Sequence, residues 1–126
     1  MLNKALIIGR LGRDVELRYT QSGQSVANFT VATDESYTDG NGQRIEATEW
    51  HRVTAFGKTA ENCSRFIGKG SLVYVEGRIR SRKYTAQDGQ ERSVTEIRAD
   101  RVLFLDKRQQ DAAPAPQQRP MDDMPF

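Results

Sequence analysis

Hydrophobic and polar residues alternate with a period of two through most of the first hundred positions of the chain. Residues two apart in a β-strand share a face, so this alternation predicts half-buried strands. It predicts them over residues 2–11, 15–19, 26–33, 46–56, 72–84 and 93–105. Glycine-containing turns separate these ranges, and the turn residues at 39–42 and 87–90 predict two hairpin tips.

One segment has a different period. Between residues 58 and 67, Ala60, Cys63, Phe66 and Ile67 recur at helical spacing, and Gly68 follows where a C-terminal cap is expected. The first two strand ranges read as one strand bent at Gly12, so the helix falls between the third and fourth strands of five. That order is typical of the OB-fold. The sequence therefore predicts an all-β fold with one short helix, a five-stranded OB-fold barrel with long hairpin loops.

The amino-acid composition of the chain changes after Asp106. Residues 107–120 contain no large apolar side chain, and such a segment cannot bury enough surface to offset the entropy of ordering it. We expect a domain over 1–106, a disordered linker over 107–120 and a separate tip over 121–126. The tip regains hydrophobicity and ends in Phe126. An inert, frayed terminus is the alternative at this point.

Composition excludes several classes of protein. The chain has 126 residues, enough for one domain, and its single cysteine and single histidine exclude a disulfide framework and argue against a structural zinc site. No apolar run approaches the ~18 residues of a membrane span. The N-terminus lacks the apolar stretch of a secretory signal, so we expect the protein to begin near Met1 and to be cytoplasmic. A net charge of +2 is too small to identify a polyanion binder, so the placement of the charges must decide.

Aromatic and arginine side chains alternate on one face of two predicted strands. In the strand 46–56, one face carries Trp50, Arg52, Thr54 and Phe56. The opposite face, with His51, Val53 and Ala55, points to the predicted interior. In the strand 72–84, the corresponding outward face carries Arg78, Arg80, Arg82 and Tyr84. Bases stack on rings for about 1–3 kcal/mol each without regard to sequence, and cations follow the phosphates. Trp50 and Phe56 could instead fill the core. The repetition on two strands, with Tyr37 near a hairpin arm, favours a binder of single-stranded nucleic acid.

Other candidate chemistry is weaker. Gly57-Lys58-Thr59 follows a strand and opens a helix, but the glycine that a phosphate-binding loop needs at position 52 is an arginine. Cys63 lies on the apolar face of the helix and reads as a buried, inert thiol. The acid pairs at 34–35 and 122–123 do not define a metal geometry, so a metal-dependent nuclease is a less favoured alternative. We expect a protein that is not an enzyme and needs no cofactor.

The residues also carry a resemblance that spans residues 2–106 and the last six positions. It rests on segments that are specific only in combination: Asn3–Gly12, Glu16–Tyr19, Thr48–Val53, Phe56-Gly57-Lys58, Lys69-Gly70-Ser71, Glu76-Gly77-Arg78, Arg80–Tyr84 and Met124-Pro125-Phe126. On these segments the chain resembles the bacterial single-stranded DNA-binding protein family, whose members act in DNA replication, recombination and repair. The resemblance implies an OB-fold DNA-binding domain over 1–106 and an acidic, partner-docking tip over 121–126.

The resemblance also assigns roles to individual residues. It implies base stacking on Tyr37, Trp50, Phe56 and Tyr84. It implies phosphate contacts for Lys4, Arg18, Arg52, Lys58, Lys69, Arg80, Arg82 and Lys83. His51 matches a subunit contact of a homotetramer, and replication, repair and recombination proteins would dock on Asp122, Asp123, Met124, Pro125 and Phe126. The expected location is the cytoplasm, in association with the bacterial nucleoid. An RNA-binding OB-fold module stays open as an alternative, because a stacking face does not itself distinguish the sugar.

Two departures from the family pattern modify these expectations. Two stacking positions carry tyrosine where tryptophan is more usual in the family, which reduces stacking area. The tip has only two acids, Asp122 and Asp123, and Met124 replaces the usual isoleucine. We therefore expect weaker binding of partner proteins than in relatives with more acidic tails.

Overall fold

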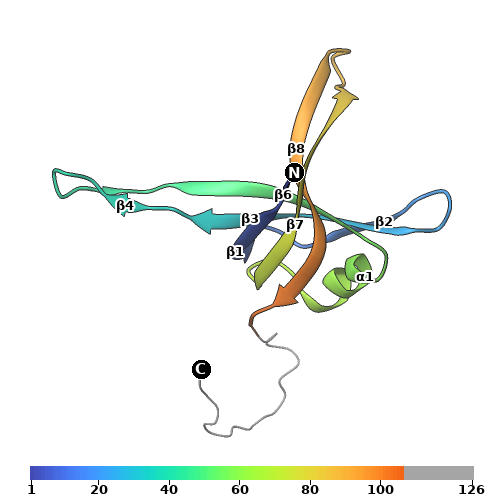
Figure 1. The fold of residues 1–126 in the computed structure, drawn as a ribbon, viewed down its shortest axis with the longest axis horizontal. Helices are drawn as coiled ribbons and strands as arrows, with labels where there is room; N and C mark the ends of the chain where they lie inside the picture. The colour runs from blue at the N-terminus through green and yellow to red at the C-terminus, as the bar shows by residue number, and fades with distance from the viewer. Residues whose placement is uncertain (107–126) are drawn as a thin grey trace, which may run out of the picture.

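The computed structural model describes residues 1–106, so the predicted linker 107–120 and tip 121–126 lie outside the described residues. Eight strands and one helix make up this part of the chain (Figure 1). They are β1 (Ala5–Leu11), β2 (Glu16–Tyr19), β3 (Ser25–Asp34), β4 (Tyr37–Thr38), β5 (Arg44–Ile45), β6 (Thr48–Phe56), α1 (Gly57–Phe66), β7 (Leu72–Thr85) and β8 (Glu91–Phe104). The order of strands and helix confirms the predicted mostly-β fold with one short helix.

Five long strands close into a ring. Neighbours pair in the order β1, β7, β8, β6, β3, and β3 returns to β1 through Arg10 opposite Ala32 and Leu11 opposite Val31. The β6–β8 pairing is parallel, whereas the other pairings are antiparallel. A Cβ at Gly9 would overlap the carbonyl oxygen of Ala32, so the close approach of β1 and β3 requires a glycine there. The ring agrees with the predicted OB-fold barrel.

Three hairpins extend outward from the ring (Figure 1): β2–β3, β3–β6 with the short β4–β5 pair at its end, and β7–β8. The predicted tips form as expected. The Asp39 N–H donates to the Gln43 carbonyl at 2.9 Å, and the Ala86 N–H donates to the Gln90 carbonyl at 2.8 Å. A positive φ occurs in each tip, and a glycine occupies it.

The barrel interior is built from small and β-branched side chains that alternate along the strands. Its fully or nearly fully buried members are Leu11, Ala27, Phe29, Val31, Val53, Ala55, Val73, Val75, Ile97 and Ala99, with Ala60, Cys63 and Ile67 from α1 and its end. Such tight packing makes the interior sensitive to changes of even one methylene. No helix among residues 1–106 has the length and apolar character needed to cross a bilayer.

The helix ends differently from the prediction. Ile67 already has extended backbone, with its N–H donating to the Cys63 carbonyl at 3.1 Å, and Gly68 does not form a left-handed cap. The left-handed glycine is Gly70, in the turn that leads to β7. The helical spacing predicts Phe66 on the apolar face, but the residue is 41% exposed, and its ring lies 6.1 Å from that of Phe104.

The first strand also starts later than the periodicity predicts, at Ala5. Asn3 explains the difference. Its side-chain amide donates to the Ile79 carbonyl at 3.0 Å, and its side-chain oxygen accepts from the Ile79 N–H at 2.9 Å. A side chain thus replaces the backbone as the partner of β7, so the pairing of the two strands ends here.

Candidate nucleic-acid interface

Strand β6 separates its side chains into two sets, largely as predicted. Val53 and Ala55 are buried in the barrel, whereas Trp50 on the opposite side is 57% exposed and Arg52 is exposed. The prediction that this side faces solvent is wrong at Thr54, which is buried; its hydroxyl donates to Asn28 Oδ1 at 3.1 Å. Thr54 lies between β3 and β8, opposite Asn28 on one side and Arg98 on the other.

Strand register brings residues of β7 and β8 to the same side as Trp50. Thr54 is opposite Arg98 of β8, and Arg98 is opposite Arg78 of β7. Directly opposed residues share a face. We call this surface the aromatic–arginine face; it comprises Trp50, Arg52, Thr54, Phe56, Arg78, Arg80, Arg82, Tyr84, Glu96 and Arg98. Lys83 is opposite Ser93 and lies on the other side of β7.

A glycine determines how Trp50 lies. The Gly12 N–H donates to the Thr30 carbonyl at 3.2 Å, at the bend between β1 and β2. A Cβ at Gly12 would overlap Cζ3 of the indole and lie 2.9 Å from Cη2. The ring therefore packs against the backbone at Gly12 and keeps more than half of its surface open to solvent. From the sequence alone, Gly12 is predicted only to bend the first strand.

The ring of Phe56 is half-buried and carries a cation. The guanidinium carbon of Arg98 lies 4.3 Å from the ring centroid, within the range of a cation–π contact. Sequence reasoning missed Arg98. The alternation along residues 93–105 assigns it to an outward position, but only the pairing of β6 with β8 shows that it reaches Phe56.

The eight cations that the resemblance assigns to phosphates fall into two groups. Three are ion-paired: Lys4 with Glu76 at 2.9 Å, Arg18 with Glu16 at 3.1 Å, and Arg82 with Glu96 at 3.5 Å. Within residues 1–106 no carboxylate lies within 4.0 Å of the other five, which are Arg52, Lys58, Lys69, Arg80 and Lys83.

Lys4 belongs to a polar cluster on the outer side of β1 and β7. The hydrogen bond from Lys4 lowers the pKa of the Glu76 carboxyl, and a 2.8 Å hydrogen bond from the Tyr74 hydroxyl lowers it further. The same contact with Glu76 raises the pKa of Lys4. This cation is already neutralised within the chain, unlike those of the second group.

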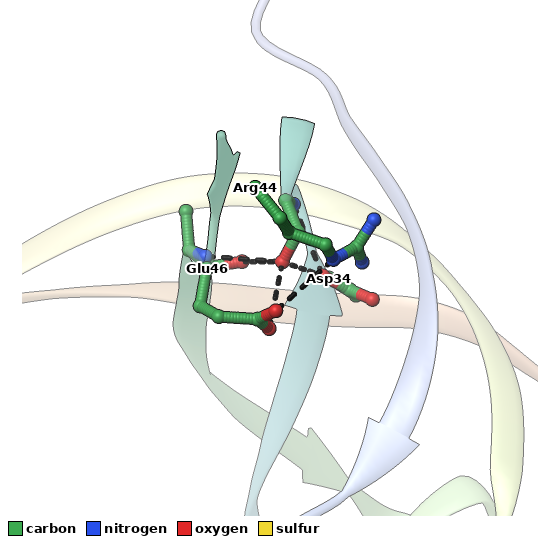
Figure 2. Close-up of polar contacts among 5 residues, drawn as sticks. Asp34, Arg44 and Glu46 are labelled. Atoms are coloured by element: carbon green, nitrogen blue, oxygen red, sulfur yellow. Dashed lines mark hydrogen bonds and ion pairs between the residues drawn. The ribbon is translucent and has the colours of Figure 1, made fainter. Parts of the chain in front are cut away.

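Tyr37 lies on β4, in the arm that extends the β3–β6 hairpin, and is 56% exposed. Figure 2 shows the polar contacts at the base of this arm. The Ser36 hydroxyl donates to Asp34 Oδ1 at 2.6 Å and accepts from the Ala47 N–H at 3.1 Å. Arg44 Nε donates to Glu46 Oε2 at 3.0 Å. The bonds from the Ser36 side chain and backbone, with the nearby Arg44 charge, lower the pKa of Asp34.

The four predicted stacking residues do not gather into a pocket. Tyr37 and Tyr84 lie on different arms of the molecule (Figure 1). Trp50 and Phe56 are six residues apart on β6, which corresponds to about 20 Å of strand. Tyr84 is 44% exposed near the end of β7. The rings are instead spread over the barrel and two of its arms, a distribution that suits a chain-like ligand better than a small molecule.

The histidine and the cysteine both lie away from solvent to different degrees. His51 is half-buried, with Nε2 at 3.0 Å from the Thr33 hydroxyl. Cys63 is buried, and burial raises the pKa of its thiol to about 12, in agreement with the inert thiol that the sequence predicts. Residues 1–106 contain no group of three or more His, Cys, Asp or Glu side chains arranged to hold a metal ion. The predicted docking residues 122–126 lie outside the described residues.

Comparison with known proteins shows to which family this chain belongs. The model of the single-strand binding protein family matches residues 2–105. The chain belongs to this family. The matched residues include the barrel, the two arms that carry Tyr37 and Tyr84, and the whole aromatic–arginine face, so they include every candidate stacking residue.

Two curated relatives in the single-strand binding protein family come from Neisseria meningitidis, one from serogroup A and one from serogroup B. Each is named single-stranded DNA-binding protein and is 50% identical over 115 residues, which cover 91% of this chain. The chain spans 66% of the length of these relatives.

Two solved structures are similar to the fold. The Plasmodium falciparum SSB in complex with ssDNA aligns with a TM-score of 0.77 and 31% identity, covering 84% of this chain and 97% of that one. A deletion mutant of the single-stranded DNA binding protein from Thermus aquaticus aligns with a TM-score of 0.72 and 34% identity, covering 85% of this chain and 52% of that one.

Proposed function

We propose that this protein binds single-stranded DNA without regard to sequence and serves DNA replication, recombination and repair. The observation that carries the proposal is the exposure of large aromatic rings on the barrel and on two of its arms. Trp50, Tyr37 and Tyr84 are 57%, 56% and 44% exposed. Large apolar surfaces that stay exposed to water usually mark interaction sites, and each of these rings can stack one base. Relatives named for single-stranded DNA binding support the same assignment.

The cations supply the second part of the mechanism. Arg52 and Arg80 share the face with the rings, and neither is ion-paired within residues 1–106. Phosphates would approach these side chains without displacing an internal carboxylate. Arg82 and Arg18 would have to exchange Glu96 and Glu16 for a phosphate, so we expect smaller net gains from them. Lys58, Lys69 and Lys83 lie off this face and would contact a strand that continues around the barrel.

The experiment that tests this function uses the only tryptophan of the chain as its probe. Oligo-dT, duplex DNA and oligo-U are titrated separately while the intrinsic fluorescence is followed at low and moderate salt. Strong quenching by oligo-dT alone is the expected result, because a base stacked on the exposed Trp50 ring quenches its emission. Oligo-dT binding that leaves the emission unchanged would remove Trp50 from the mechanism, and no binding at all would overturn the function.

Two other functions remain as outcomes of related measurements. Equal quenching by oligo-U would favour an RNA-binding OB-fold module. Turnover of a labelled oligonucleotide in the presence of magnesium would favour a nuclease. We expect intact oligonucleotide, because the two adjacent acids Asp34 and Glu35 engage Ser36 and Thr33 and do not converge on a common point.

We infer further that the protein is a homotetramer. The N-terminal half of β1 pairs with β7 on one side, and within residues 1–106 only Arg10 and Leu11 pair on the other. Leu6 and Ile8 on this strand are 57% and 56% exposed. A free strand edge beside exposed apolar side chains supports association with a second copy. His51 is the residue that the resemblance places at such a contact.

The last part of the proposed function is the binding of partner proteins by the tip at 121–126. An acidic segment that ends in an aromatic residue can enter an apolar pocket with a basic rim, and we propose that replication, repair and recombination proteins provide such pockets. The site of action would be the nucleoid in the bacterial cytoplasm. The domain over 1–106 would bind DNA while the segment 107–120 separates the tip from it.

A further inference from the structure

Arg98 occupies a position that the family resemblance does not assign to any role. Its guanidinium carbon lies 4.3 Å from the centroid of the Phe56 ring. A base stacked on that side of the ring would need the same space. Either Arg98 moves away when DNA binds, or Arg98 itself contacts the DNA with Phe56 as its support.

The charges around Arg98 favour direct contact. Arg98 is directly opposite Arg78 in the β7–β8 ladder, and like charges in opposed positions destabilise a sheet. Asp100 lies 3.9 Å from Arg78 and offsets that charge. Within residues 1–106 no carboxylate comes within 4.0 Å of Arg98. Arg98 thus joins Arg52 and Arg80 as cations of this face without a carboxylate partner in this part of the chain.

The position of Arg98 suits an anionic strand. It lies on β8 between Thr54 of β6 and Arg78 of β7, so a strand that crosses the sheet at this level passes over it. The side chain is half-buried and rests on a ring, so it has less rotamer freedom to lose on binding than a fully exposed arginine. A guanidinium is also matched in geometry to a phosphate.

We propose that Arg98 contacts the phosphate backbone of single-stranded DNA and that Phe56 acts as a positioning residue that holds its guanidinium. This inference rests on the proposed function and adds a ninth cation to the eight that the resemblance assigns. It also changes the role of Phe56, whose ring supports a phosphate contact on the side that Arg98 covers.

The test measures the affinity of the full chain for oligo-dT as a function of monovalent salt. Arg98→Gln removes the charge and keeps a planar, polar end. Loss of one contact with a single strand lowers the slope of log K against log salt by about 0.7, so the affinity ratio of wild type to variant falls about 2.6-fold between 50 and 200 mM salt. We expect this change for each protomer engaged. Arg98→Lys keeps the slope and loses less affinity.

Arg65→Gln is the matched control. Arg65 also lies over a phenylalanine, with its guanidinium carbon 5.8 Å from the Phe66 centroid, but it belongs to α1 and not to the face. It removes the same charge and the same kind of contact, and we expect the wild-type slope. Melting curves of each variant confirm that it is folded.

A double-mutant cycle tests the role of Phe56. In a Phe56→Leu background, Arg98→Gln is expected to cost less affinity than in the wild type, because the support is already absent. Equal costs in both backgrounds would overturn the positioning role.

Other outcomes separate this inference from the proposed function. An unchanged slope for Arg98→Gln in a protein that binds oligo-dT would overturn the contact and leave the function standing. A higher affinity of that variant would show that Arg98 masks the Phe56 ring, which also overturns the contact. A wild type that does not bind oligo-dT would overturn both.

Discussion

At the scale of single residues, the candidate site depends on what lies beneath each ring. The indole of Trp50 rests on Gly12, and the ring of Phe56 is covered by Arg98. The first arrangement leaves a ring face open to a base, whereas the second replaces one face with a cation. Two aromatics on the same strand therefore have different chemistry, although their alternation along β6 is the same.

Trp50→Ala is expected to weaken oligo-dT binding by about 1–3 kcal/mol, or roughly 5- to 150-fold, because one stacked base is lost. Trp50→Phe keeps a ring and is expected to retain most of the affinity. Fluorescence anisotropy of a labelled oligonucleotide measures both variants. Equal losses in the two would contradict stacking as the role of this side chain.

Gly12→Ala tests the support of the indole. The added methyl group overlaps the ring, so Trp50 must shift, and we expect a change in its emission maximum together with weaker quenching by oligo-dT. Gly40→Ala is the control, since a Cβ there meets nothing within 4 Å and the backbone has no positive φ. An emission spectrum identical to that of the wild type would show that the contact with Gly12 does not position the ring.

At the scale of elements, the arm that carries Tyr37 is joined to the barrel by the cluster in Figure 2. Ser36 bonds both to Asp34 at the end of β3 and to Ala47 before β6. The main-chain bond from the Glu35 N–H to the Ala47 carbonyl, 2.8 Å long, joins the same two strands. The Ser36 side chain thus bridges the interruption of the ladder at this point and joins the arm to the barrel.

The pKa of Asp34 depends on the hydrogen bonds from Ser36, so it can be used to test whether this junction is formed. Because it is lowered in the folded protein, the carboxylate contributes stability above the pKa of the unfolded chain, and that contribution is lost as the pH falls through the folded value. Ser36→Ala is expected to raise the pKa of Asp34 towards its usual value. Carboxyl NMR titration measures the shift, and Thr38→Ala, on the same arm, serves as control. An unmoved pKa would mean that the serine does not hold the junction.

At the scale of the whole molecule, the proposed tetramer and the proposed tip are separate properties. The first belongs to the outer side of β1, and the second to residues 121–126. Neither set of residues belongs to the aromatic–arginine face. Variants can therefore remove one property and leave the other.

Leu6→Glu tests the tetramer. A charge in the middle of the exposed side of β1 is expected to shift the sedimentation coefficient to that of a smaller species at micromolar concentration. Tyr19→Glu is the control, because Tyr19 is 64% exposed on β2 and away from this surface. A wild type that sediments as a monomer would refute the tetramer.

Deletion of residues 121–126 tests the tip. DNA affinity is expected to stay the same or rise, because removing two acids makes the chain more positive and favours binding to a polyanion. Capture of replication and repair proteins from a bacterial lysate is expected to be lost. A Phe126→Ala variant isolates the aromatic side chain, and unchanged capture by both variants would refute the docking role.

The sequence by itself determined the element order, the hairpin tips and most of the inside and outside positions. These depend on local chemistry: the period of two along a strand, the turn residues at 39–42 and 87–90, and the apolar spacing at Ala60 and Cys63. The same alternation placed Trp50 outside and Val53 inside. The alternation failed at Thr54, which is buried. The helical spacing failed at Phe66, where another surface ring, that of Phe104, provides the contact.

Only the tertiary structure decided which outward residues meet. Arg98 reaches Phe56 because β8 pairs in parallel with β6, 44 residues apart at the Thr54–Arg98 pair (98 minus 54). Lys4 is neutralised because β1 lies beside β7, and Gly12 supports Trp50 because the bent strand returns to β3. Periodicity predicts on which face of a strand a side chain lies, but it does not predict the register between distant strands. The pairing of those strands decides which charges and rings come into contact.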